Sequence, residues 1–318
     1  MQKLIITLCI FIVLSLKAEE RMNVSSLVFF DATYNETVSF NITRSYLDFR
    51  KSLSADIAAR VTVDAARIGS TDSLIINEHL TFYVKYAYLV WNTEAGSFLI
   101  GQQPTNYFGP STATWGLRFI EKQPSDLWKF DPTADLGLSY RKNFSENLLI
   151  HLAAYNGRGY KYGENDKYKR LSVLISLGEQ RLNANSGWNA GGVVSYEPYD
   201  DSTSMKKVLR LSGFAGYANN SFRLGVEVLK SDDNGGSNSQ LYSIYGNLSL
   251  METLDVLARV DLYNRDVEID GDGKTYLITG IHYQPTVGFS IAPSIHYTNY
   301  EDDTDPVISI KFNFQFRF

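Results

Sequence analysis

The chain ends in the stretch Ile308-Ser309-Ile310-Lys311-Phe312-Asn313-Phe314-Gln315-Phe316-Arg317-Phe318. Apolar and polar side chains alternate through it without exception. Successive side chains of a β-strand point to opposite faces of the sheet, so this segment predicts a strand with one apolar face and one wet face.

The same alternation recurs along the chain, and no sustained helical period competes with it. Runs of about ten residues predict sixteen strands, an even number, as outer-membrane barrels require. The predicted strands are Ser25–Tyr34, Arg44–Leu53, Asp56–Ala66, Leu80–Trp91, Ser97–Gln103, Asp135–Arg141, Leu148–Asn156, Lys167–Leu177, Trp188–Glu197, Lys207–Ala218, Phe222–Lys230, Leu241–Leu250, Leu254–Asn264, Thr275–Tyr283, Val287–Tyr297 and Val307–Phe318.

The connections between these strands alternate in length. Tight turns are predicted at Ser54-Ala55, Asn92–Gly96, Lys142–Asn147, Asn219–Ser221, Met251–Thr253 and Gln284–Thr286. Longer polar joins lie between them, at Asn35–Thr43, Arg67–His79, Gly157–Asp166, Pro198–Lys206, Ser231–Gln240, Arg265–Lys274 and Asn299–Pro306. Gly178–Gly187 is longer than a tight turn should be. Short turns at one rim and long loops at the other predict an all-β, antiparallel transmembrane β-barrel.

Composition agrees with a β-rich membrane protein. The 318 residues carry a net charge of −5, 14% are aromatic and the mean hydropathy is −0.18. These values exclude a disordered chain, a bundle of membrane helices and a basic nucleic-acid-binding protein. A secreted β-sandwich also alternates, but the clustering of aromatic residues toward strand ends favours two membrane-interface girdles.

The beginning of the chain differs from the rest. Lys3 precedes an apolar run, Leu4–Leu16, and the small residue Ala18 follows just before a polar stretch. This pattern predicts a secretory signal peptide at 1–18 and one barrel domain at 19–318. Cys9, the single cysteine, lies inside the predicted signal peptide, so we expect neither a disulfide nor a thiolate metal site in the mature protein.

With these features the chain resembles bacterial outer-membrane porins. Several segments resemble more narrowly the phosphate-selective porin O/P-like family: Arg44–Arg50, Gly96–Gln103, Phe119–Glu121 and Asp135–Leu138. The resemblance implies a location in the bacterial outer membrane, contact with its lipids and lipopolysaccharide, and a homotrimer. It also implies that the barrel-assembly machinery recognises the terminal aromatic residues Phe312, Phe314, Phe316 and Phe318.

The one very long connection runs from Pro104 to Ala134 and is rich in aromatic residues, so it can pack. It is the third outward loop, and the resemblance implies that it folds into the lumen. An external lid or a protomer contact is the alternative. Facing charges across a constriction create an electric field. The loop's candidate constriction residues are Arg118, Glu121, Lys122, Asp126, Lys129 and Asp131.

Alternation also predicts which wall residues face the lumen. The cationic pore-lining candidates are Arg44, Arg50, Arg60, Lys85, Arg141, Arg170, Arg210, Arg223, Arg259, Lys311 and Arg317. Rings of basic side chains favour anions. The alternative is that these residues brace the wall through salt bridges and select nothing.

The sequence therefore predicts a porin for passive diffusion of small hydrophilic solutes and ions, with a modest anion preference. A channel specific for phosphate or another anion is one alternative, and a plugged barrel acting as adhesin or anchor is another. The four histidines are too scattered to predict a metal site, and Ser294 with His296 is too common a pairing to predict catalysis. We expect no enzyme activity, no cofactor and no nucleic-acid partner.

Overall fold

The computed structural model describes residues 22–67, 80–164, 166–200, 204–302 and 304–318. The predicted signal peptide at 1–18, with Cys9, lies outside the described residues. No helix in the part of the chain that the structure describes has the length and apolarity that a membrane-spanning helix needs.

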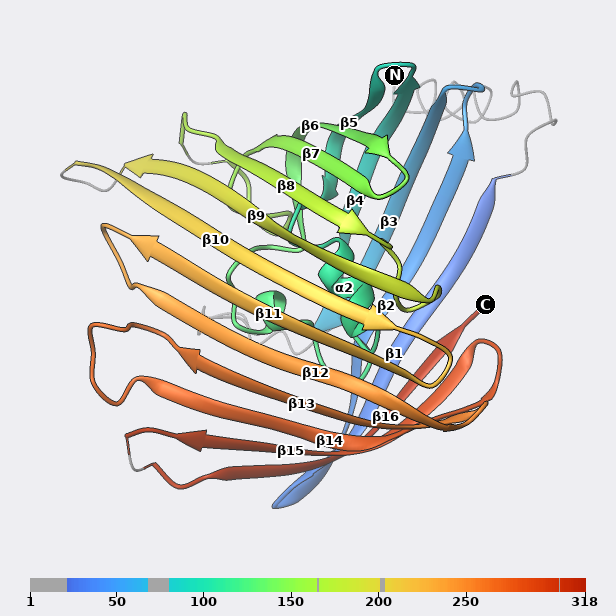
Figure 1. Ribbon diagram of the computed structural model, residues 1–318, viewed down its shortest axis with the longest axis vertical. Helices are drawn as coiled ribbons and strands as arrows, with labels where there is room; N and C mark the ends of the chain where they lie inside the picture. Colours follow the sequence, from blue (N-terminus) through green and yellow to red (C-terminus); the bar gives the residue numbers. More distant parts are fainter. Residues whose placement is uncertain (1–21, 68–79, 165, 201–203, 303) are drawn as a thin grey trace, which may run out of the picture.

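Sixteen strands form one closed antiparallel barrel, which confirms the predicted fold class (Figure 1). Every strand pairs with its sequence neighbours, and the barrel closes between the first and last strands. The strands are β1 Asn23–Asn35, β2 Thr37–Ser52, β3 Ile57–Arg67, β4 Leu80–Thr93, β5 Gly96–Pro104, β6 Ala134–Ser145, β7 Leu148–Tyr155, β8 Arg170–Gly178, β9 Gly187–Asp200, β10 Met205–Ala218, β11 Phe222–Asp233, β12 Ser239–Met251, β13 Leu254–Asn264, β14 Gly273–Thr286, β15 Phe289–Tyr300 and β16 Val307–Arg317.

The terminal stretch that predicted a strand closes the barrel. Leu27 of β1 pairs with Arg317 of β16, and the backbone of Ser26 exchanges two hydrogen bonds with Phe318. The apolar residues of β16 face outward, where the Phe30 and Phe314 rings stack at 4.4 Å between centroids. Closure leaves no free sheet edge, which a membrane-spanning sheet could not tolerate.

The connection lengths distinguish the two rims. At the inner rim, which holds both ends of the barrel, the turns between strands are short; the longest, at 179–186, joins β8 to β9. The outer rim carries the long connections at 105–133 and 156–169. Short turns face the periplasm and long loops face outward in barrels of this kind.

Several predicted outer joins are wrong because the strands continue through them. β2 begins at Thr37, so the predicted join Asn35–Thr43 is a turn at Glu36, whose φ is 58°. Thr43 is skipped at a bulge, where Phe29 pairs with Arg44 and Phe30 with Ile42. Because a bulge inverts which residues face inward, it hid the alternation in the sequence.

Two further outer joins are also shorter than predicted. The join Pro198–Lys206 shortens because β9 reaches Asp200 and β10 begins at Met205. The join Ser231–Gln240 shortens because β11 reaches Asp233 and β12 begins at Ser239. In both places the strand ends are polar, so their composition resembled that of loops.

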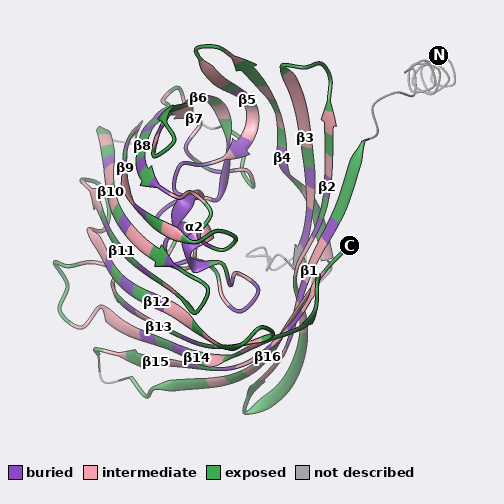
Figure 2. Cartoon of the chain, turned by 45° about the vertical axis from the view of Figure 1, so that its right-hand side comes forward, coloured by how far each residue is buried: buried purple, intermediate pink, exposed green. Residues whose placement is uncertain are grey.

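The long connection folds into the lumen, as expected, and is the only part of the described chain that forms helices (Figure 2). It contains two short helices, α2 Pro110–Trp115 and α3 Pro124–Leu127. Both begin with proline, which suits the first turn of a helix because its missing N–H would be unpaired there. Figure 2 shows α2 buried inside the ring of strands.

Candidate functional site

The infolded loop, residues 105–133, reaches opposite sides of the barrel. Trp115 packs edge-on against Tyr245 of β12 at 5.4 Å between ring centroids. Phe119 lies 6.3 Å from Phe29 of β1 and 5.6 Å from His282 of β14. The loop also reaches β8, where Arg170 pairs with its Asp131, so its contacts extend around the lumen wall from β8 to β1.

One side of the lumen, formed by β10 and β11, is shaped to receive α2. A Cβ added to Gly225 would lie 2.7 Å from Cγ2 of Thr114 and 2.4 Å from the Tyr245 ring. One added to Gly216 would lie 2.5 Å from the same Thr114 atom. Arg223 donates a hydrogen bond to the Trp115 carbonyl at 3.1 Å. These glycines let the helix approach the sheet closely.

Buried arginines of the wall hold the second half of the loop. Arg170 of β8 pairs with Asp131 of the loop and, at 3.2 Å, with Asp135 of β6. Arg259 of β13 pairs with Asp261 at 2.5 Å and donates to the Lys122 carbonyl. The Arg170 and Arg259 side chains are 1% and 0% exposed, so protein atoms surround them and water does not reach them.

The cavity on the outer side of the loop has a volume of about 390 Å³, and we call it the outer vestibule. Five cationic side chains line it against two carboxylates, Asp31 and Glu121. The cations are Arg44, Arg118, Lys122, Lys161 and Lys311. Burial, and to a smaller extent the nearby Arg44, lower the pKa of Lys161.

The cavity on the inner side of the loop has a volume of about 610 Å³, and we call it the inner vestibule. Six cationic side chains line it against a single carboxylate, Asp48. The cations are Arg50, Arg60, Lys85, Arg118, Arg181 and Arg317. Asp48 already accepts from Arg50 at 2.6 Å and from Arg60 at 2.7 Å. Cations therefore outnumber carboxylates among the residues that line this cavity.

Arg118 lines both vestibules and marks the place where they meet. Its guanidinium lies 4.5 Å from the centroid of the Phe108 ring. Its one ion pair, to Asp126, is long at 3.4 Å. Arg118 therefore contributes its charge to both vestibules.

The predicted wall cations all occupy lumen-facing positions, but the structure divides them into two groups. Six line a vestibule: Arg44, Arg50, Arg60, Lys85, Lys311 and Arg317. Four instead contact the loop or a wall carboxylate: Arg170, Arg210, Arg223 and Arg259. Arg141 of β6 stands apart from both groups, exposed near the inner rim.

The predicted loop charges also divide. Arg118, Glu121 and Lys122 line a vestibule, and Asp126 pairs with Arg118. Asp131 is buried against Arg170 instead. Lys129 is exposed and lines neither vestibule, and its φ of 58° marks a turn just after α3.

Two vestibule residues, Lys161 and Arg181, were missed by the sequence analysis. Lys161 belongs to the outer connection 156–169, where its Nζ lies 5.3 Å from the Tyr83 ring. Arg181 belongs to the overlong inner turn 179–186, and its neighbour Leu182 is 2% exposed. The unusual length of that turn was the signal that it folds inward.

Glu121 ends a chain of hydrogen bonds that ties the loop to β14 and β15. Tyr276 donates to Glu121 at 2.8 Å, and its hydroxyl lies 2.6 Å from Nδ1 of His296. Ser294 lies 2.9 Å from Nε2 of the same imidazole. Burial raises the pKa of Glu121, but Lys311, His296 and Arg259 outweigh it, so the pKa lies below its ordinary value.

Ser294 and His296 are the last members of this chain of hydrogen bonds, and neither residue lines a vestibule. Both residues are buried, at 3% and 4% exposed. The described residues hold no cluster of three or more His, Cys, Asp or Glu side chains arranged as metal ligands.

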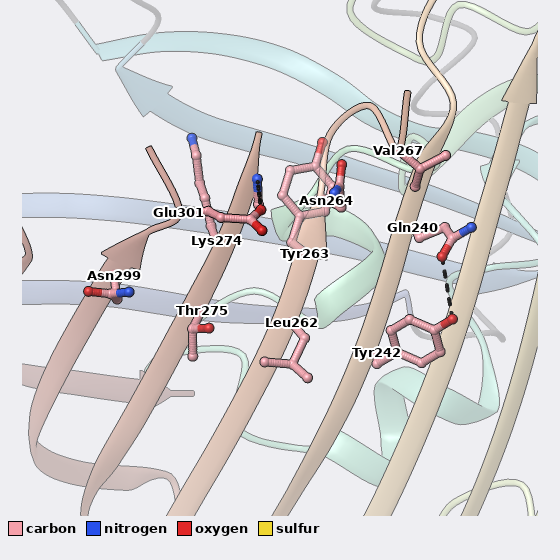
Figure 3. A pocket seen from close by; sticks show the side chains of 11 residues that line it. Gln240, Tyr242, Leu262, Tyr263, Asn264, Val267, Lys274, Thr275, Asn299 and Glu301 are labelled. Atoms are coloured by element: carbon pink, nitrogen blue, oxygen red, sulfur yellow. Dashed lines mark hydrogen bonds between the residues drawn. The ribbon is translucent and has the colours of Figure 1, made fainter. Parts of the chain in front are cut away.

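A further pocket lies at the outer rim of β12–β15 (Figure 3). Gln240, Tyr242, Leu262 and Thr275 line it, and all four occupy outward-facing positions of their strands. Because side chains alternate across a strand, this pocket belongs mainly to the outer wall and not to the path through the lumen.

Comparisons with known proteins bear on the fold. No family model matches the sequence, and no curated protein matches it either. Among solved structures, the outer membrane channel DcaP of Acinetobacter baumannii has a TM-score of 0.70 at 14% identity, over 95% of this chain and 98% of that one. The anion-selective porin from Comamonas acidovorans has a TM-score of 0.67 at 8% identity, over 94% and 100%. OmpT of Vibrio cholerae, in its trimer form, has a TM-score of 0.61 at 12% identity, over 94% and 99%.

At such identities the likeness establishes the fold alone. The chain has the fold of the outer-membrane porins, closed barrels whose apolar outer wall lies in the bacterial outer membrane. The narrower resemblance to the phosphate-selective family stays a prediction.

Proposed function

We propose that this barrel is a channel for passive diffusion of small hydrophilic solutes and ions, with a preference for anions. The observation that carries the proposal is the charge of the two vestibules. Cations outnumber carboxylates by five to two in the outer vestibule and by six to one in the inner one. Arg118 contributes to this excess of positive charge in both vestibules.

The size of the effect follows from elementary electrostatics. Two unit charges 4 Å apart interact by about 4 kcal/mol at an effective dielectric constant of about 20. An ion in a narrow cavity meets several such charges at once. Salt screens the interaction over roughly 10 Å at 0.1 M, so the preference should be strongest in dilute salt.

The experiment is a reversal-potential measurement on single channels in a planar bilayer under a salt gradient. We expect open-channel steps and a potential of the sign that anion preference gives. Replacing two inner-vestibule cations, Arg60→Gln with Arg317→Gln, should shift the potential toward cations. Lys142→Gln is the control, because it removes a positive charge from an outward-facing position of β6.

The plugged-barrel alternative gives the opposite result. The infolded loop touches both sides of the lumen, which is the observation that favours a plug. A plugged barrel serving as adhesin or anchor would show no channel steps, and that outcome would overturn the proposal. A channel specific for one anion would show steps that saturate with that anion. The proposal assigns no catalytic step to the buried Ser294–His296 pair.

Assembly into the membrane is proposed to depend on the terminal strand. Phe318 is 77% exposed and its backbone pairs with Ser26, at the seam where the barrel closes. Strand addition to an open edge uses backbone pairing together with alternate side chains. Deleting Phe318 should slow membrane insertion, measured by heat-modifiable migration on gels over time. Unchanged insertion kinetics would contradict this role.

A homotrimer is proposed for the mature protein. Ala59 occupies an outward position of β3, where a small side chain lets a second wall approach closely. Native mass measurement in mild detergent should give three times the protomer mass. Replacing Ala59 with Leu should shift the population toward monomer, and a wild-type monomer would refute the proposal.

A further inference from the structure

The inner vestibule holds two cations whose donors are incompletely paired: Lys85, and Arg118, whose partner Asp126 lies 3.4 Å away. Nζ of Lys85 donates to the Tyr46 hydroxyl at 3.2 Å and forms no ion pair with a carboxylate of the described residues. Nε of Arg118 is buried without a hydrogen-bond partner in the described chain. By contrast, the buried Arg170 and Arg259 are both paired with carboxylates. An unpaired buried donor is costly, which points to a partner that comes from outside the protein.

The two cations share one aromatic wall. The Phe108 ring lies 4.5 Å from the Arg118 guanidinium and 5.3 Å from Nζ of Lys85, measured to its centroid. Tyr46 and Tyr86 lie 4.8 Å and 5.6 Å from the same Lys85 nitrogen. All five residues line the inner vestibule, so the charges and the flat rings face one cavity.

We propose that Lys85 and Arg118, with the rings of Phe108, Tyr46 and Tyr86, bind small aromatic carboxylates at the point where the vestibules meet. This inference rests on the proposed channel function and names its substrate class. A carboxylate accepts the free donors of Arg118 and Lys85. The attached ring packs against the aromatic wall, where offset or edge-on contacts are favourable.

The composition of the site favours this class over inorganic anions. Phosphate and acetate have no flat apolar surface, so they gain the charge contacts but not the ring contacts. The inner vestibule, at about 610 Å³, falls in the size range of small-molecule pockets, roughly 300–1,000 Å³. A bound aromatic acid at this place stands in the route between the two sides.

The experiment measures how benzoate, acetate and phosphate interrupt the single-channel current of the full barrel. Benzoate should half-block at a concentration roughly two- to tenfold below that of acetate, the range that one aromatic contact gives. Phe108→Leu should remove this difference and keep the anion preference of the reversal potential. Phe108→Tyr, which keeps the ring, should retain the difference. Arg118→Gln should weaken the block by all three anions.

Each outcome decides the proposal. Equal block by benzoate and acetate, with anion preference intact, would overturn the aromatic site and leave the proposed channel function standing. Block by phosphate at lower concentration than benzoate would overturn it in favour of an inorganic-anion site. A wild-type channel that shows no preference for anions would overturn both proposals. Heat-modifiable migration of each variant shows that its barrel is closed.

Discussion

The two sides of the lumen use the same kinds of residue in opposite ways. On the side formed by β8–β13, arginines are buried and paired, and the loop packs against the sheet. On the side formed by β1–β4 and β16, arginines and lysines line open cavities. Arg259 and Arg60 both face inward, yet one holds the loop and the other faces a cavity. Inward facing therefore does not reveal whether a charge braces the barrel or meets a solute.

The largest expected effect comes from breaking the packed side. Arg170→Ala would leave Asp131 and Asp135 buried without their cation. Removing one partner of a buried pair costs roughly 3–5 kcal/mol. We expect a loss of that size in the free energy of unfolding, measured by urea titration in lipid vesicles, together with noisier channel current.

The matched change on the cavity side should hardly alter the free energy of unfolding. Arg50→Ala removes an ion pair to Asp48, but the Arg50 side chain is 58% exposed. Exposed pairs contribute roughly 0–1 kcal/mol. Equal losses in the two variants would mean that the two sides do not differ as described.

A smaller effect should follow from filling the space that α2 occupies. In Gly225→Ala the new methyl group would overlap Thr114 and the Tyr245 ring. Overpacking of this kind costs roughly 1–3 kcal/mol. We expect reduced stability and a changed conductance, because the displaced helix belongs to the loop that divides the lumen.

Gly213→Ala is the control for that change. Gly213 lies on the neighbouring strand β10, and a Cβ added there would meet nothing within 4 Å. Both variants replace a glycine in a β-strand with alanine, so the change in intrinsic strand propensity is the same. A variant at Gly213 as unstable as the one at Gly225 would show that α2 is not the cause.

The smallest expected effect concerns pH at the boundary between the two sides. The pKa of Glu121 is depressed in the folded protein, so its charge stabilises loop docking at neutral pH. That contribution is lost as the pH falls through the depressed pKa, below about 4.3, the ordinary value for glutamate. Unfolding free energy should therefore drop in acid for the wild type, and less for Glu121→Gln. Glu252→Gln, at an exposed inner turn, is the control and should follow the wild type.

The sequence predicted the barrel because its signal is local and repeated. Alternation over about ten residues gives each strand two unlike faces, and sixteen repeats with two kinds of connection leave few other folds. The inward facing of the wall cations followed from the same alternation. It failed at Thr43, where a bulge shifts the register, and in the polar strand ends next to Asp200 and Asp233.

What the charges do was decided only by the tertiary structure. The infolding of the long loop was expected, but not where its 29 residues, 105–133, would come to rest. Glycines of β10 and β11 receive α2, whose Trp115 covers Arg259, while two cavities stay at the side of β1–β4. Pairing between Arg170 and Asp131 joins residues far apart in sequence, and no local pattern records such a contact. The sequence by itself determined the wall, and the packing of the loop decided which parts of that wall meet a cavity.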